Sequence, residues 1–164
     1  MRRTAFFALM MGLLLLGCQP AEDNGNVRQD IPFTPQGILD IMRPDSSIIV
    51  RVVIEIAEGD SARARGLMDR RSLPAKGGML FLDEAPREQS FWMRNTLLPL
   101  DIIFIDEANQ IINIAERTRP LTETTVTSAA PALLVLEMRG GFCEQYGIDS
   151  TAFIRWERRN FEDA

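Results

Sequence analysis

Short apolar runs with a two-residue period constrain the fold of this chain more than any other feature. In the run at 47–57, Ile48 and Val50 lie on one face. Arg51 and Glu55 lie on the other. Such alternation is typical of a β-strand with one buried face. Turn signals separate this run from similar ones, namely GILDIMR, GGMLFL, QSFWMRN, LDIIFI, IINIAER, ALLVLEMR and TAFIRW. The chain is therefore expected to be rich in β-strands.

One interruption of the β pattern has helical spacing. In the segment 58–70, Asp60 or Ser61 is the predicted N-cap. Apolar residues then recur at Leu67 and Met68, three and four positions after an alanine. A short amphipathic helix is expected here. The segment GGFCEQYGI, between the last two strands, is predicted to form a second helical turn.

These elements predict an α+β fold that is mainly β. We expect about eight short strands in a compact barrel-like or strongly curled antiparallel sheet, with one or two short helices. The reason is that an open antiparallel sheet of this size would expose long unpaired edges. Pro44 and Asp45 are expected to form a hairpin turn between the first two strands, and Asn109 a left-handed turn between the middle pair.

Composition limits the size of the core and the chemistry. With 164 residues, 46% of them hydrophobic, the chain fits one globular domain. It contains no histidine, which excludes triads built on imidazole and zinc sites with histidine ligands. Its 23 acidic and 18 basic residues give a net charge of −5, which disfavours nucleic acid as a partner. No calcium-loop motif occurs, so neither a metal nor a cofactor is predicted.

The N-terminal residues have the features of an export signal. Arg2 and Arg3 precede an uncharged stretch that ends at Gly17, which is shorter than the ~20 residues of a membrane-spanning helix. The tetrapeptide Leu15–Cys18 resembles the lipoprotein box of bacteria, which implies cleavage after Gly17 and a lipid on Cys18. The alternative is an ordinary signal peptide that is followed by an unmodified cysteine.

The export signal divides the chain into parts. The predicted order is a signal peptide at 1–17, the lipidated Cys18 with a flexible tether at 18–36, a single β-rich domain at 37–157 and a charged tail at 158–164. The tether prediction depends on its three prolines and few large apolar residues. Gln19 stands where an aspartate would favour retention at the inner membrane, so an outer membrane facing the periplasm is the expected location.

Four segments in a fixed order carry a family resemblance. GLMDRRSLP, GGMLFL, FWMRNTLLPLDIIFID and PALLVLEMRGG resemble the family known as domain of unknown function 192, over 37–156. The resemblance implies a β-rich fold, but the family has no agreed catalytic residues or substrate. The chain departs from the family pattern at Asn109 and at 149–151, and both positions are predicted turns.

Asp101 is the first candidate for a functional side chain because it interrupts an apolar strand. In LDIIFI it shares a face with two isoleucines. A buried carboxylate without a partner is strongly unfavourable, so Arg94 or the polar groups of Asn95 and Thr96 are its expected partners. The cluster would either bind a ligand or exchange protons, or it would be a structural pair that fixes the loop at 96–99.

Glu137 is the second acidic candidate, on the strand ALLVLEMR. If it faces the same pocket as Asp101, the two carboxyl groups would act as acid and base in a hydrolase or lyase. This is the weaker hypothesis, because only their separation decides whether such a pair exists.

Aromatic and polar residues before Asp101 predict a binding groove. Phe91 and Trp92 point to opposite faces of a strand, so one of them needs a cover or a ligand. The predicted binding residues are Trp92, Arg94, Asn95, Thr96 and Asp101. Core packing of the aromatic side chains is the default interpretation against which this groove is weighed. The arginines between 63 and 71 are interpreted as a solvated face.

Cys143 is the cysteine that remains once Cys18 carries lipid, so no internal disulfide is predicted. Without a histidine to activate it, a buried and inert thiol is expected. A mixed disulfide with a partner is the alternative.

These features predict a lipid-anchored protein of the cell envelope that binds a glycan, a peptide or an envelope protein without turnover. The alternatives are a carboxylate-dependent hydrolase or lyase and a purely structural module. The membrane, reached through the lipid on Cys18, is its other predicted partner.

Overall fold

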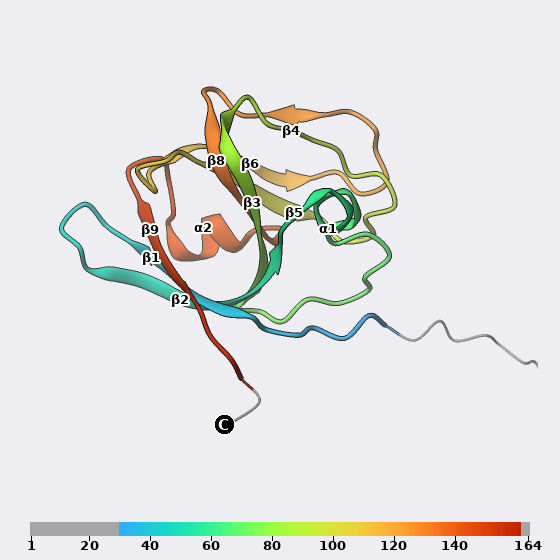
Figure 1. Ribbon diagram of the computed structural model, residues 1–164, viewed down its shortest axis with the longest axis horizontal. Helices are drawn as coiled ribbons and strands as arrows, with labels where there is room; N and C mark the ends of the chain where they lie inside the picture. The colour runs from blue at the N-terminus through green and yellow to red at the C-terminus, as the bar shows by residue number, and fades with distance from the viewer. Residues whose placement is uncertain (1–29, 162–164) are drawn as a thin grey trace, which may run out of the picture.

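The computed structural model describes residues 30–161. The predictions for the signal peptide, for Cys18 and for the tether up to residue 29 lie outside this part. Within it the chain forms nine strands and two short helices (Figure 1). The strands are β1 (Gly37–Met42), β2 (Ile48–Ala57), β3 (Gly77–Arg87), β4 (Ser90–Phe91), β5 (Leu100–Ile105), β6 (Ile111–Thr118), β7 (Val126–Thr127), β8 (Ala132–Arg139) and β9 (Phe153–Arg158). The helices are α1 (Asp60–Arg65) and α2 (Phe142–Tyr146).

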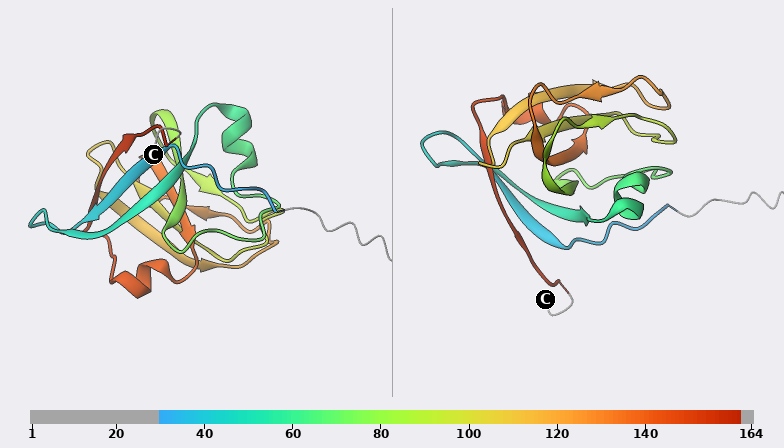
Figure 2. Two further views of the ribbon diagram at one scale, coloured as in Figure 1. Left: turned by 90° about the horizontal axis from the view of Figure 1, so that it is seen from below. Right: turned by 45° about the horizontal axis from the view of Figure 1, so that its top comes forward.

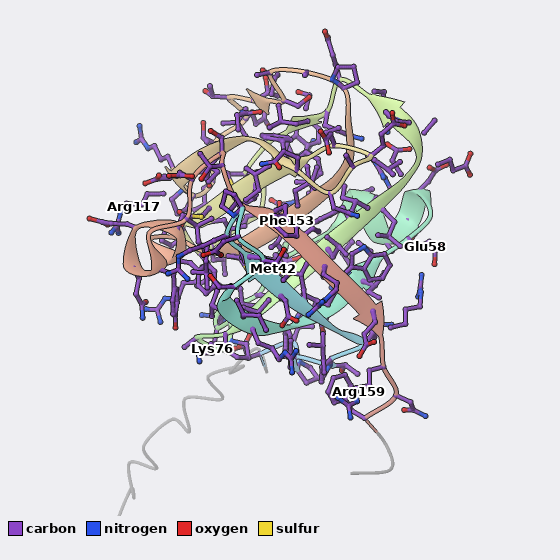
Figure 3. The ribbon with its side chains drawn as sticks, turned by 90° about the vertical axis from the view of Figure 1, so that its left-hand side faces the viewer. Met42, Glu58, Lys76, Arg117, Phe153 and Arg159 are labelled. Atoms are coloured by element: carbon purple, nitrogen blue, oxygen red, sulfur yellow. The ribbon has the colours of Figure 1, made fainter. Side chains whose placement is uncertain are left out.

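Seven strands form one open sheet in the order β6-β5-β8-β3-β2-β1-β9, and β4 pairs with β7 in a separate ribbon. Figure 3 shows Met42 and Phe153 near each other, where β1 pairs with β9. The predicted mainly β fold with two short helices is confirmed, whereas the predicted closed barrel or strongly curled sheet is wrong. An isolated bridge between Gln110 and Phe153 ties the turn after β5 to the start of β9.

The sheet is mixed because β2 and β3 run parallel, with Val53 opposite Gly77. Parallel neighbours cannot be joined by a hairpin, and here the connection through α1 supplies the crossover. The prediction of a purely antiparallel sheet overlooked that the helical segment lies between two strands of the same sheet. β8 then inserts between β5 and β3, antiparallel to both.

Two apolar cores lie on the two faces of the sheet. The α2-side core contains Ile103, Leu136 and Phe142. The α1-side core contains Phe81 and Ile102. All six residues of β5 are buried, because successive side chains of this strand enter alternate cores.

Several local predictions are confirmed. β1 and β2 form a hairpin, and Asn109 has the left-handed backbone expected of a turn residue, with φ 63°. The predicted helix cap at Asp60 or Ser61 is wrong, since Gly59 is the N-cap and no side chain caps the helix. The helix is also shorter than predicted and ends before Gly66.

The segment from Asp30 to Gln36 contacts the domain. The N–H of Thr34 donates to Glu55 at 2.7 Å, and Glu55 pairs with Arg70 at 2.6 Å, with both side chains buried. The N–H of Arg71 donates to Asp30 at 2.9 Å. These contacts hold the segment against β2 and the turn that follows α1.

Neither helix in the described range has the length and hydropathy needed to cross a membrane.

Candidate functional site

Glu137 lies in the middle of β8, between Met79 of β3 and Ile102 of β5. Both neighbours belong to the α1-side core, so Glu137 points into that face of the sheet. The residue is 5% exposed. Within 30–161, no residue offers its carboxyl group a hydrogen bond or an ion pair. Burial raises the pKa of Glu137 to about 8. At neutral pH the side chain is therefore a neutral acid with a proton to donate.

Glu137 lines a pocket of about 360 Å³ between α1 and the sheet. One wall is the segment 63–68, and the opposite wall is the segment 87–92 around β4. Phe81, Thr96 and Glu137 complete the lining. The pocket is large enough for one sugar-sized or amino-acid-sized group, at the lower end of the range for ligand pockets.

Gly66 brings the first wall close to the sheet. Its backbone has φ 47°, and a Cβ atom added to it would lie 3.1 Å from the ring of Phe81. Only glycine adopts such a backbone without strain and also leaves this space. The sequence Arg65–Gly66–Leu67 thus ends α1 and closes the apolar side of the pocket.

Aromatic side chains form the other apolar side. Phe91 packs edge-on against Phe81, with ring centroids 5.0 Å apart. Trp92 is 46% exposed, and the guanidinium carbon of Arg94 lies 5.6 Å from the centre of its ring. The alternation of Phe91 inward and Trp92 outward is as predicted, although the strand ends at Phe91 rather than continuing through 95.

Asp83 organises the polar rim. It accepts hydrogen bonds from Arg63 at 2.9 Å, from Arg87 at 2.6 Å and from Gln89 at 2.7 Å. Burial by itself would raise the pKa of Asp83, but the bonds from Gln89 and Arg87 and the charge of Arg63 hold it at about 2. This network fixes Arg63 and the buried Gln89 at the pocket. Arg65 is exposed, and no described residue pairs with its guanidinium group.

Asp101 lies on the other face of the sheet, in the α2-side core, and is fully buried. Its carboxylate accepts backbone N–H bonds from Arg117 at 2.8 Å, Gly141 at 3.0 Å and Cys143 at 2.8 Å. Asp101 thus has partners, as predicted, but the predicted partners Arg94, Asn95 and Thr96 are wrong. Backbone donors contributed by later segments of the chain are not visible in a sequence motif. Figure 3 shows Arg117 beside α2, where it also pairs with Glu144.

The two acidic candidates do not face one pocket. Ile102 is the residue opposite Glu137, and Met138 is the residue opposite Asp101. Neighbouring residues on a strand point to opposite faces, so Asp101 and Glu137 lie on opposite sides of the sheet. The hypothesis of a catalytic pair made by these two residues is wrong.

The remaining predicted binding residues divide between the pocket and the surface beside it. Trp92 and Thr96 line the pocket with Glu137. Arg94 is exposed and pairs with Glu123 at 3.8 Å, and the carbonyl of Asn95 accepts a bond from Asp69 at 2.8 Å. The structure therefore brings together Trp92, Thr96 and Glu137 but not Arg94, Asn95 or Asp101.

Sequence reasoning missed Arg63, Phe81 and Gln89 as parts of the site. Arg63 was interpreted as part of a solvated face, and nothing in the spacing of the other two marks them. The available signal was Glu137 itself, a single acid in an apolar strand like Asp101.

Cys143 is fully buried and free. Burial, the negative charge of Asp101 and a bond to it raise the pKa of the thiol far above its ordinary value. Burial of this thiol is as predicted, and a buried thiol that holds its proton is expected to be inert. In residues 30–161 no group of three or more acidic or cysteine side chains is arranged to hold a metal ion.

The fold and the site define a small mixed β-domain with a buried carboxyl group at a pocket beside a short helix. The sequence profile of the DUF192 family, described as Uncharacterized ACR, matches residues 41–156. The chain belongs to this family, which confirms the predicted resemblance.

Crystal structures of other proteins resemble the chain, among them the following two. One is a protein of Sinorhizobium meliloti 1021 described as a "putative transcription regulator", 28% identical, with a TM-score of 0.71, covering 76% of this chain and 97% of that protein. The other is a protein of unknown function from Novosphingobium aromaticivorans DSM 12444, 36% identical, with a TM-score of 0.67, covering 73% of this chain and 84% of the other. No curated protein matches the sequence.

Proposed function

We propose that the protein is a lipid-anchored binding protein of the cell envelope that takes a small ligand into the Glu137 pocket. The observation that carries the proposal is Glu137, a residue that is 5% exposed, lines a pocket and has no partner for its carboxyl group among residues 30–161. The Glu137 side chain lines the pocket, and a ligand atom that accepts its proton would form a hydrogen bond that no described residue supplies.

The lining of the pocket indicates the chemistry of the ligand. Phe91 and Trp92 suit a ring or another apolar face. Arg65 at the rim suits an anionic group, because it has no intramolecular partner in the described part. A neutral Glu137 does not repel such a group. The proposed ligand is therefore an envelope component that carries a carboxylate next to a ring, such as an acidic sugar.

The test compares two substitutions at position 137. Glu137→Gln keeps the shape and a neutral donor, whereas Glu137→Leu keeps only the apolar volume. Thermal shifts are recorded against acidic sugars and their uncharged analogues. Wild type and Glu137→Gln should respond to the acidic members, and Glu137→Leu should lose at least about tenfold in affinity, as expected for a lost hydrogen bond. Equal responses of all three proteins would contradict the proposal. So would the absence of any response of the wild type to an acidic sugar.

Anchoring and location are supported by the export signal and by Cys18. Several acyl chains on one cysteine would hold the protein firmly, since each buried methylene contributes about 0.8 kcal/mol. Cells that express wild type or Cys18→Ser are labelled with a palmitate analogue and fractionated. Label on the wild type alone, recovered with the outer membrane, is the expected result. Label on Cys18→Ser would contradict lipidation at this site.

Nucleic-acid binding, which the description of the Sinorhizobium meliloti relative raises, has less support. The chain carries 23 acidic against 18 basic residues, and an export signal would place it away from the genome. A hydrolase that uses Asp101 and Glu137 has less support for another reason, because the two residues lie on opposite faces of the sheet.

A further inference from the structure

Exposed apolar side chains gather on two neighbouring loops. Trp92, Leu97 and Leu121 are 46%, 39% and 64% exposed, respectively, and we call them the loop patch. The loops that carry them are joined by backbone hydrogen bonds. The N–H of Leu121 donates to the carbonyl of Thr96 at 3.1 Å, and the N–H of Met93 donates to that of Thr122 at 3.0 Å. The two loops that carry the patch are therefore fixed relative to each other.

Leu121 has two features that are unfavourable for an isolated domain. Its backbone has φ 57°, a left-handed conformation that is rare for residues other than glycine, asparagine and aspartate. Its side chain is also the most exposed of the large apolar side chains in the described part. Neither strain nor exposure improves packing within the domain, so both point to a role outside it.

The chain enters the domain at the same end as the loop patch. Asp30 accepts a hydrogen bond from the N–H of Arg71 at 2.9 Å, and nearby the N–H of Asp69 donates to the carbonyl of Asn95 at 2.8 Å. Figures 1 and 2 show the first described residues, in blue, ending on the side of the domain that carries α1 and the loops after β4 and β6. The hairpin between β1 and β2, with the exposed Ile48, projects on the opposite side.

The length of chain before Asp30 limits the distance to the membrane. Between Cys18 and Asp30 a fully extended chain spans at most about 40 Å, at ~3.3–3.6 Å per residue. A lipid on Cys18 would therefore keep the patch end of the domain near the bilayer. The local concentration of lipid around the patch would be high without any other contact.

We propose that the loop patch docks on the lipid bilayer, with Trp92, Leu97 and Leu121 in the headgroup region. Tryptophan prefers this interface because its ring is apolar and its N–H remains hydrated. Arg94, which lies over the Trp92 ring, and the exposed Arg119 would meet the lipid phosphates. This inference rests on the proposed anchor, and it gives the anchored domain one orientation relative to the membrane.

The test uses the mature chain with Cys18→Ser, so that binding by the acyl chains does not mask the patch. Trp156→Phe leaves Trp92 as the reporter, and vesicles of phosphatidylethanolamine and phosphatidylglycerol are added. We expect Trp92 emission to shift to the blue. We also expect the partition coefficient to fall at least about tenfold in the double variant Leu97→Ser/Leu121→Ser, because two apolar side chains would no longer be transferred from water to the bilayer. Ile48→Ser, which removes an exposed apolar side chain at the other end of the domain, is the control and should retain binding.

Three outcomes would overturn the proposal. They are an unchanged emission spectrum at saturating lipid, equal losses in the double variant and in Ile48→Ser, or a blue shift without vesicles that follows dimer formation. Circular dichroism and melting curves of the variants exclude loss of fold as the cause. Leu97 and Leu121 do not line the Glu137 pocket, so ligand binding of the double variant separates failure of this inference from failure of the proposed function.

Discussion

The N–H of Cys143 donates a 2.8 Å hydrogen bond to Asp101, and this contact ties the first turn of α2 to β5. Arg117 and Gly141 donate to the same carboxylate. A sequence that loses this acceptor leaves three backbone N–H groups without this partner, one in β6 and two at the start of α2. Asp101 is therefore a structural residue, although its burial in an apolar strand first marks it as a candidate for chemistry.

Asp101→Ala is expected to lower the free energy of unfolding by about 3–5 kcal/mol, because buried N–H groups that lose a partner cost about 1–3 kcal/mol each. Urea denaturation measures the change. Asp45→Ala is the control, since Asp45 accepts a single bond in an exposed turn and its loss should cost less than about 1 kcal/mol. Equal losses in the two variants would contradict the structural role of Asp101.

Glu137 makes stability depend on pH. Its pKa in the folded protein is about 8, above the ordinary value of 4.5, so the folded state holds a proton that the unfolded state releases. Stability is fully present below the unfolded pKa and is lost as the pH rises through the folded pKa. Between pH 4.5 and pH 8, the free energy of unfolding of Glu137→Gln should therefore rise relative to that of the wild type, by up to about 1.4 kcal/mol per pH unit. Urea denaturation of both proteins at several pH values tests this, and parallel curves would show that Glu137 has no raised pKa.

Gly66→Ala should destabilise the protein more than Gly59→Ala. Both positions have positive φ, and this strain costs about 1–3 kcal/mol in either variant. Only the Cβ atom at 66 would meet a neighbour, the ring of Phe81 at 3.1 Å, whereas that at 59 would meet nothing within 4 Å. The melting temperatures of the two variants show which one is less stable. A larger loss for Gly59→Ala would contradict the close approach of this wall to the sheet.

Glu55 and Arg70 should be strongly coupled. They pair at 2.6 Å with 7% and 8% of their side chains exposed, and removal of one partner leaves a buried charge, which costs about 3–5 kcal/mol. Glu55→Gln and Arg70→Met should each lower the free energy of unfolding by about this amount. The double variant should lose less than the sum of the two single losses. Additive losses in a double-mutant cycle would exclude the coupling.

The thiol of Cys143 should react with a disulfide reagent only after unfolding. It is fully buried, and its raised pKa keeps it protonated. The mature chain with Cys18→Ser leaves this thiol alone for measurement in native buffer and in urea. A rate in native buffer equal to that in urea would show that the site is open.

Sequence predicts the elements of this fold better than their arrangement. The alternation at 47–57 and the turn at Asn109 depend on neighbouring residues, and both predictions are confirmed. The parallel pairing of β2 with β3 and the insertion of β8 depend on contacts between distant segments. Local periodicity carries no information about such pairing, so the expected barrel was wrong.

The same limit applies to the site. That a buried acid such as Asp101 needs partners follows from elementary electrostatics, and it has them. Which groups supply them depends on α2 and β6, which lie far along the chain. That Asp101 and Glu137 occupy opposite faces follows only from the register of β5 against β8. One strand cannot reveal the register of its neighbour.

The protonation state of Glu137 in the native protein tests the central claim most directly. Carbon NMR of protein labelled at glutamate side chains follows each carboxyl group through a pH titration, and Glu137→Gln identifies the resonance. The account predicts a carboxyl group that is neutral at neutral pH and titrates near pH 8. A Glu137 resonance that titrates near its ordinary value of 4.5 would contradict the unpartnered acid on which the proposed ligand site depends.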